Sequence, residues 1–550
     1  MPPPNPVQCS QTGCKLYNSY GVWGDRKDCP VQAVVYPTTE EELRSAVANA
    51  NKNHLKVKVV SRFSHTIPKL ACPTNQSRAI LISTEKYNTS IDVDVASMTV
   101  TADAGVGLRA VIDRVEAEGL SLVAAPYWEG VSVGGVISTG AHGSSWRGRG
   151  GAVHDHVVGI RLIVPAKESE GFARVLDLRS GDPLLNAAKV SLGMLGVISK
   201  VRLMLEGGFK RSITLNFTND RRIEDEFMEH GKKYEFGDIQ WYPSRHTAVY
   251  RYDDRLPINT SGDGVYDFVG FQSNFAIIAK SVRASGSCLY SPETAKDTVC
   301  PWDPRIKGLF FYETTAIFSA TSFADFVQDI KKLRDINPNS FCGVDIYNGF
   351  LIRFVPKSEA YLGQPEDSVV VDFNYYRADE VWTPRLNQDI WEEAEQMAFF
   401  KYGARPHWGK NRNVAFVGVE KKYPSFGRFV EAKRRVDPGN VLGSEWTDEI
   451  VFGRGVVDED GCALEGRCVC SEDRHCSPGN GYYCRRGLVY VEARVCRYLS
   501  NSSKSGEVGT CFTDKKMIML AGLGSPDKNY QFGPYCWARY EKSESSIMRS

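Results

Sequence analysis

The chain has 550 residues, of which 42% are hydrophobic and 11% aromatic, and its formal net charge is +1. This length exceeds one typical hydrophobic core and predicts two or three folding units. Because nucleic acids and acidic membrane surfaces normally require an excess of Lys and Arg, the balanced charge argues against both as partners. The chain contains no charge-free apolar run of about 18 residues, so we expect no membrane span.

The first two hundred residues alternate between strand and helix patterns. Residues 31–35 read as a strand, 37–52 as a helix with a capping-box spacing at its start, and 55–60 as an alternating strand. This order predicts a β-α-β unit. The loop 61–73 follows at the carboxyl end of the second strand, where open α/β sheets usually bind their ligands.

A glycine-rich stretch follows the next strand-turn-helix pattern at 98–126. Residues 132–151 read "SVGGVISTGAHGSSWRGRGG" and hold seven glycines, yet they match neither the phosphate-loop nor the dinucleotide fingerprint. Glycines allow close approach of the backbone to a ligand, and the interleaved Ser and Thr offer hydroxyl donors. A single glycine pair would indicate only a tight turn. Seven glycines with hydroxyl neighbours instead predict a loop that binds a diphosphate.

The pattern changes at about residue 207. Longer alternating strands rich in Tyr and Phe, with helices such as 324–335 between them, predict a second domain built on a mainly antiparallel sheet. A helix beginning at 427 is stopped by the Asp-Pro-Gly of 437–439. The expected organisation is an N-terminal Cys-containing segment (1–29), an α/β unit (30–206), the second domain (207–400), a return segment (401–455) and a Cys-rich extension (456–550).

Cysteines and glycosylation sequons indicate the secretory route. Fifteen cysteines are present, and eight of them lie in the last hundred residues: Cys462, Cys468, Cys470, Cys476, Cys484, Cys496, Cys511 and Cys536. A segment so poor in apolar runs needs disulfides to hold a shape, although eight cysteines allow 105 pairings. Five N-x-[ST] sequons start at Asn75, Asn88, Asn216, Asn259 and Asn501. We expect a secreted protein whose signal peptide is absent from this sequence, since the start "MPPPNPVQC" has no apolar h-region.

Several motifs, in order along the chain, resemble one family. These are the loop that contains His65, "GGVISTGAHGS" (134–144), "SLGMLGVIS" (191–199), "HWGK" (407–410) and "DPGNVLG" (437–443). They resemble the vanillyl-alcohol-oxidase type of FAD proteins, particularly the sugar-lactone oxidoreductases, and with the Cys-rich extension the chain is similar to plant L-gulonolactone oxidase-like proteins. The resemblance implies an α+β fold in which a two-subdomain FAD-binding α/β unit precedes a substrate domain with a mainly antiparallel sheet.

The resemblance also implies which residues bind FAD. The diphosphate would lie against a set of residues in the glycine-rich stretch: Gly134, Gly135, Ser138, Thr139, Gly140, His142, Gly143 and Ser144. The adenine would lie near Gly196, Val197 and Ile198. His65, between Ser64 and Thr66, matches the position at which many members attach the flavin covalently through an imidazole nitrogen, and His142 is the reserve candidate. The glycines that usually surround this histidine are absent here.

Catalytic candidates follow from the chemistry and from the same resemblance. Hydride removal from a carbon that bears a hydroxyl needs a base for the hydroxyl proton and positive charge for the reduced flavin. His407 and Lys410 suit these two roles, and Arg353 matches the cation of the family's Glu-x-Arg pair. Leu351 stands where that pair has its acid, and a leucine cannot accept a hydrogen bond from a sugar hydroxyl.

The sequence therefore predicts an FAD-dependent oxidase of a sugar lactone. The expected substrate is L-gulono-1,4-lactone, oxidised at C2 toward ascorbate, with oxygen or another acceptor reoxidising the flavin. A related carbohydrate or alditol oxidase or dehydrogenase is the alternative that Leu351 favours. A secreted, catalytically weak carbohydrate-binding flavoprotein is the alternative from another class. No metal site is expected.

Overall fold

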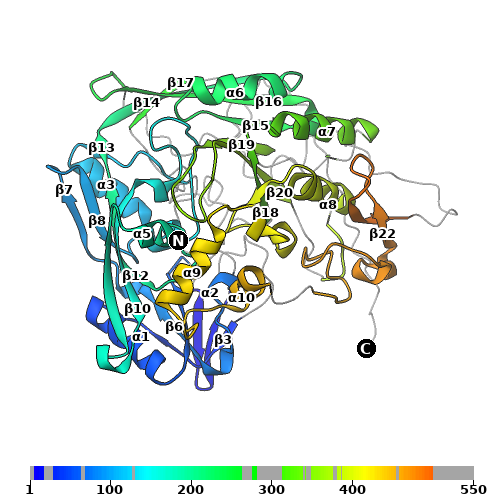
Figure 1. Cartoon of the computed structure of the whole chain (residues 1–550). Coiled ribbons are helices and arrows are strands. Elements are labelled where there is room, and N and C mark those ends of the chain that lie inside the picture. Colours follow the sequence, from blue (N-terminus) through cyan, green and yellow to red (C-terminus); the bar gives the residue numbers. More distant parts are fainter. Residues whose placement is uncertain are drawn as a thin grey trace, which may run out of the picture.

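The computed structural model describes residues 5–17, 29–63, 68–126, 131–262, 276–280, 312–337, 341, 349–375, 381–385, 387–453 and 457–499. Figure 1 shows two regions rich in strands, a blue-to-cyan N-terminal part and a green part that contains a long antiparallel sheet, with an orange Cys-rich hairpin at the side of the second. Yellow segments from the return part of the chain lie between the two regions.

A three-stranded parallel sheet opens the N-terminal part of the α/β unit. Its order is β4-β6-β5, and helix α1 connects β4 to β5 as the sequence predicts. Thr39 caps α1 by accepting the Glu42 N–H, and Leu43, Val47 and Ala50 are buried at helical spacing. The elements are β4 (Ala33–Val35), α1 (Glu40–Lys52), β5 (Lys56–Val60) and β6 (Ala79–Ser83). A small antiparallel sheet precedes them, formed by β1 (Val7–Ser10), β2 (Gly13–Leu16) and β3 (Cys29–Val31).

A second sheet with five antiparallel strands follows. Its order is β11-β10-β12-β8-β7, and helix α3 buries Leu108, Val111, Ile112 and Val115 in the adjoining core. The elements are β7 (Ile91–Asp94), β8 (Thr99–Asp103), α3 (Leu108–Ala117), β10 (Val157–Pro165), β11 (Ala173–Arg179), α5 (Pro183–Ala188) and β12 (Val197–Met204). The two sheets together form the predicted α/β unit.

The glycine-rich stretch is in part a helix. Residues Val133–Ser138 form α4, in which the Ser132 side chain accepts the Gly135 N–H and Val133, Val136 and Ile137 are buried. The expectation of an irregular loop over 134–144 is therefore wrong for its first half. Three apolar residues at helical spacing and a serine N-cap decide the local structure in spite of two glycines.

An eight-stranded antiparallel sheet forms the second domain. Its order is β17-β14-β16-β15-β19-β20-β18-β21. Its strands are β14 (Phe209–Asn219), β15 (Asp238–Tyr242), β16 (Thr247–Pro257), β17 (Ala276–Lys280), β18 (Tyr312–Ser319), β19 (Phe350–Val355), β20 (Ser368–Tyr375) and β21 (Arg405–Pro406). Helices α6 (Ile223–Lys233), α7 (Phe323–Ile336) and α8 (Gln388–Gln396) accompany it.

The return segment joins the two domains. It adds β21 to the edge of the large sheet and continues through α9 (Phe426–Val436). Between α9 and α10 (Glu445–Phe452) the chain reaches the parallel sheet, where the Val57 N–H donates to the Val441 carbonyl at 2.8 Å. The Cys-rich extension follows with the hairpin β22 (Tyr482–Arg486) and β23 (Arg494–Tyr498). No helix within the described ranges is both long and apolar enough to cross a membrane.

Candidate active site

Three adjacent strands of the large sheet bring charged side chains to one face. Arg353 lies on β19, Asp372 on β20 and Glu313 on β18. In the register, Asp372 is opposite Leu351 on one side and opposite Thr315 on the other. Because residues two apart share a strand face, Arg353, Asp372 and Glu313 lie on the same face of the sheet.

Asp372 lies at the centre of an ionic network. It forms an ion pair with Arg353, and its Oδ1 lies 3.0 Å from the Lys410 Nζ and accepts the Thr315 hydroxyl at 2.5 Å. Burial would raise the pKa of Asp372, but Arg353 and Lys410 outweigh burial and hold that pKa well below its ordinary value. Asp372 is therefore a charged group that fixes both cations.

Glu313 completes the network on the other side of Lys410. Its Oε2 lies 3.0 Å from the Lys410 Nζ, and its side chain is 12% exposed. Burial raises the pKa of Glu313 above its ordinary value, with Asp372 adding to that effect and Lys410 and Arg353 opposing it. A carboxylate with a raised pKa is a stronger base than an ordinary carboxylate, which suits it to accept a proton.

Two buried histidines face each other beside this network. The rings of His142 and His407 have centroids 5.4 Å apart. The His407 Nδ1 accepts the Gly409 N–H at 3.0 Å, so the neutral ring carries its proton on Nε2. The His142 Nδ1 donates to the Gly143 carbonyl at 2.9 Å, which leaves Nε2 as an unprotonated acceptor with no hydrogen-bond partner among the described residues. Burial lowers the pKa of each histidine well below 6.5, and Arg353 and Lys410 add to this.

The HWGK segment is held rigidly at the sheet edge. Its His407 N–H donates to the Asn411 side chain at 2.9 Å, and the Trp408 Nε1 donates to the Leu362 carbonyl at 3.0 Å. The sequence therefore predicted correctly that Arg353, His407 and Lys410 come together. The Gly409 N–H occupies the Nδ1 lone pair of His407, so the ring presents a donor at Nε2 in this geometry, and the role of His407 as the base stays a prediction.

Sequence reasoning missed Asp372 and Glu313. The signal for Asp372 was an acid inside the apolar run "SVVVDFNY" (368–375), because a buried charge in a strand requires a partner. Glu313 carried no comparable signal, since its approach to Lys410 depends on strand order in the sheet. Acidic side chains are thus present on β20 and β18, although position 351 on β19 is a leucine.

The predicted hydroxyl donors of the glycine-rich stretch bond to the protein itself. Ser138 donates to the Gly134 carbonyl at 2.7 Å, and Thr139 donates to the Gly135 carbonyl at 2.9 Å. Ser144 donates to the Gly237 carbonyl at 2.6 Å and accepts the Phe354 N–H, which links this stretch to the second domain. The expectation that these hydroxyls donate to a diphosphate stays a prediction, and such contacts would have to replace these bonds to backbone carbonyls.

Gly140 and Gly143 are among the positions of this stretch where the structure favours glycine. At Gly143 a Cβ would lie 2.6 Å from the Ala125 carbonyl oxygen, and Gly140 has φ +69°, a conformation that favours glycine. Gly196 is similar, because its Cβ would lie 2.6 Å from Leu162 Cγ where β12 packs on β10. Val197 and Ile198 are buried in the core. Ser64, His65 and Thr66 lie outside the described residues, so covalent attachment at His65 stays a prediction.

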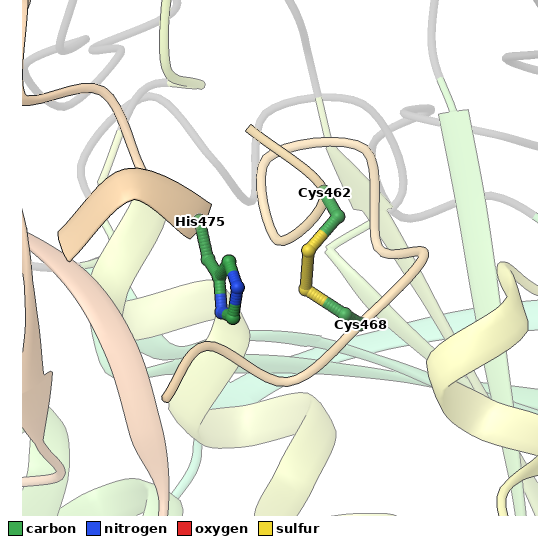
Figure 2. A group of neighbouring side chains, drawn as sticks. All are labelled: Cys462, Cys468 and His475. Carbon is green, nitrogen blue, oxygen red and sulfur yellow. A yellow bond between two sulfur atoms is a disulfide. The ribbon is translucent and has the colours of Figure 1, made fainter. Parts of the chain in front are cut away.

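Two groups of Cys and His side chains in the extension have metal-like spacing. They are Cys462, Cys468 and His475, and Cys470, Cys476 and Cys496. Figure 2 shows Cys462 and Cys468 joined in a disulfide beside His475. The other three sulfurs are also in disulfides, and His475 is hydrogen-bonded to Asp458 at 2.7 Å. Because a metal binds the thiolate, these pairings account for both groups without a metal.

Comparisons with known proteins agree with this architecture. Three family models match: an FAD binding domain over residues 31–168, D-arabinono-1,4-lactone oxidase over 320–450, and the C-terminal domain of L-gulonolactone oxidase 2-like proteins over 459–498. The chain is 58% identical to L-gulonolactone oxidase 3 of Arabidopsis thaliana, over 90% of this chain and 94% of that protein. The chain belongs to the L-gulonolactone oxidase family.

More distant members of the family and a solved structure extend the comparison. L-gulonolactone oxidase of Scyliorhinus torazame is 24% identical over 78% of this chain and 97% of that protein. The structure of a His121Ala mutant of cholesterol oxidase from Brevibacterium sterolicum aligns with a TM-score of 0.63 at 14% identity, over 82% of this chain and all of that one. That likeness shows the fold alone. Family membership makes the protein an FAD-dependent aldonolactone oxidase.

The residues of the site fit FAD. The His142 Nε2 is a buried acceptor without a hydrogen-bond partner among the described residues, so it is available to a donor on a bound group. Arg353 and Lys410 supply positive charge beside it, which suits a cofactor that becomes anionic on reduction. We assign His142, Arg353 and Lys410 as the groups of the described chain that would face the flavin.

Proposed function

We propose that the enzyme oxidises L-gulono-1,4-lactone at C2 toward ascorbate, with oxygen or another acceptor taking the electrons. The observation that carries this proposal is the buried network in which Lys410 lies 3.0 Å from both Asp372 and Glu313. Such a network offers a carboxylate acceptor and fixed positive charge at one place, which alcohol oxidation requires. The names of the related proteins support the choice of a lactone as substrate.

Each residue of the proposed site has a separate role in this reaction. FAD, when bound, supplies the acceptor for the hydride that leaves C2. Glu313 accepts the proton of the C2 hydroxyl, so the C–H and O–H bonds break while the C=O bond forms. Arg353 and Lys410 stabilise the negative charge that develops, and Asp372 holds them in position. His407 donates from Nε2 and orients the substrate.

A related alditol or aldose oxidase is the second candidate. Leu351 favours it, because the acid of the site comes from β18 rather than from β19 and a different hydroxyl pattern would then be recognised. We also propose an oxidising, secretory compartment, which the five disulfides of the described residues support.

Turnover of a substrate panel distinguishes these candidates. The purified flavoprotein is given L-gulono-1,4-lactone, L-galactono-1,4-lactone, D-arabinono-1,4-lactone and a straight-chain alditol, with oxygen or an artificial dye as acceptor. The proposal predicts the highest kcat/KM for L-gulono-1,4-lactone, with ascorbate as product. A higher kcat/KM for the alditol would favour the second candidate and contradict the first.

A further inference from the structure

Helix α8 is buried on its polar side as well as on its apolar side. Ile390, Trp391 and Ala394 belong to the core of the large sheet. Yet Glu392, Glu393 and Glu395 are also buried, with Glu393 fully so. Burial of three carboxylates within nine residues is costly unless each has partners. Those partners show what covers this helix.

The Cys-rich extension covers one side of α8 (Figure 1) through its backbone. Glu393 accepts three consecutive N–H groups, those of Leu488, Val489 and Tyr490, at 2.6 to 2.8 Å. Gln396 forms two hydrogen bonds to the backbone of Arg494, one as donor at 2.7 Å and one as acceptor at 3.0 Å. Charge-assisted bonds from a buried carboxylate to backbone N–H groups are strong, so this docking is specific.

Glu395 points instead toward the segment that carries Lys410. It forms an ion pair with Arg412 and accepts the Thr314 hydroxyl at 3.0 Å. The Thr314 Oγ1 accepts from the Asn411 side chain at 2.8 Å, and Asn411 in turn accepts the His407 N–H. Two hydrogen bonds, from Asn411 to Thr314 and from Thr314 to Glu395, thus connect the segment 407–414, called here the catalytic segment, to α8.

The extension also contacts the catalytic segment directly. The Gly466 carbonyl accepts the Val414 N–H at 2.9 Å, and the Leu464 carbonyl lies 3.5 Å from the Arg412 Nη1. Both carbonyls belong to the loop closed by the Cys462–Cys468 disulfide, which Figure 2 shows. The loop therefore holds the chain two to four residues after Lys410.

We propose that the Cys-rich extension positions the catalytic segment 407–414, with Glu395, Arg412 and the Cys462–Cys468 loop as the positioning elements. The inference rests on the proposed function, in which Lys410 and His407 act on the lactone. If the loop opens or Glu395 loses its charge, Lys410 moves relative to Asp372 and Glu313. A displacement of about 1 Å at a catalytic group costs up to roughly 100-fold in rate.

Two variants of the full-length flavoprotein test the proposal, each with a matched control. Glu395→Gln is compared with Asp389→Asn on the same helix. This control removes the 2.7 Å ion pair between Asp389 and Arg497 of β23, but no contact to the catalytic segment. The double variant C462S/C468S is compared with C9S/C14S, which opens a disulfide loop one residue shorter in the β1–β2 hairpin. Each protein is assayed for kcat, KM, Tm and hydrogen exchange of peptides covering 407–414.

We expect kcat to fall roughly 10- to 100-fold in both test variants, with KM within about twofold of wild type and faster exchange at 407–414. The controls should keep wild-type kcat and exchange, even where Tm falls equally. Unchanged kcat and exchange in the test variants, or equal losses in their controls, would overturn the proposal. If the wild-type protein oxidises no lactone, the proposed function fails, while the exchange data still decide whether the extension holds this segment.

Discussion

At the scale of residues, the candidate site depends on which strands carry its acidic side chains. The expected acid position is occupied by Leu351, and the acids of the site lie instead at Asp372 on the adjacent strand β20 and at Glu313 on β18, one strand further. Asp372 is charged and fully committed to Arg353, Lys410 and Thr315. Glu313 is the acid whose raised pKa and partial exposure allow it to exchange a proton with substrate.

Replacing Glu313 tests this division of roles. Because the pKa of Glu313 lies above its ordinary value, wild-type kcat/KM should fall on the acid side at a pH higher than 4.5. Glu313→Gln should lower kcat by roughly 10²- to 10⁴-fold and abolish this acid limb. The control is Glu366→Gln, which loses a 3.0 Å contact to Arg405 at the half-exposed sheet edge. An acid limb that persists in Glu313→Gln would contradict the assignment.

At the scale of elements, α8 connects the large sheet to the extension through buried carboxylates. Glu392 accepts the Cys496 N–H at 2.5 Å and the Gln388 side chain at 2.6 Å. Burial nevertheless raises the pKa of Glu392 to about 7. The charged form is thus less stable in the folded protein than in the unfolded chain.

The stability of this contact should depend on pH. Between pH 4.5 and 7 the folded state binds more protons at Glu392 than the unfolded state does, so stability falls as pH rises through this window. Relative to Glu392→Gln, the wild-type unfolding free energy should fall by on the order of 3 kcal/mol from pH 5 to pH 8. Urea unfolding of both proteins at the two pH values measures this difference. If the difference in unfolding free energy between the two proteins is the same at pH 5 and pH 8, Glu392 does not cause the pH dependence.

At the scale of the whole molecule, local patterns predicted the elements but not how they meet. Helix α1, the strand β5 and the end of α9 before Asp437 follow from capping, alternation and proline, which act within a few residues. The site instead depends on the strand order β19-β20-β18-β21, which brings residues 313, 353, 372 and 410 together. Strand order is set by packing between distant segments, so no single motif could reveal Glu313.

The glycine-rich stretch shows the same limit in a smaller region. Its glycines predicted a loop that offers hydroxyl donors, whereas buried Val133, Val136 and Ile137 make its first half a helix. The hydroxyl of Ser144 joins the two domains through Gly237 and Phe354, contacts that only the tertiary structure provides. The family motifs therefore predicted Arg353, His407 and Lys410, and the fold places Asp372 and Glu313 beside them.

Anaerobic reduction of the bound flavin tests the central claim most directly. Wild-type protein and Lys410→Met are mixed with L-gulono-1,4-lactone without oxygen, and the visible flavin absorbance is followed with time. The account predicts complete bleaching in a single turnover for wild type, and bleaching roughly 100-fold slower for Lys410→Met, because one fixed positive charge is lost. Flavin that stays oxidised in the wild-type protein, or equal rates in the two proteins, would contradict it.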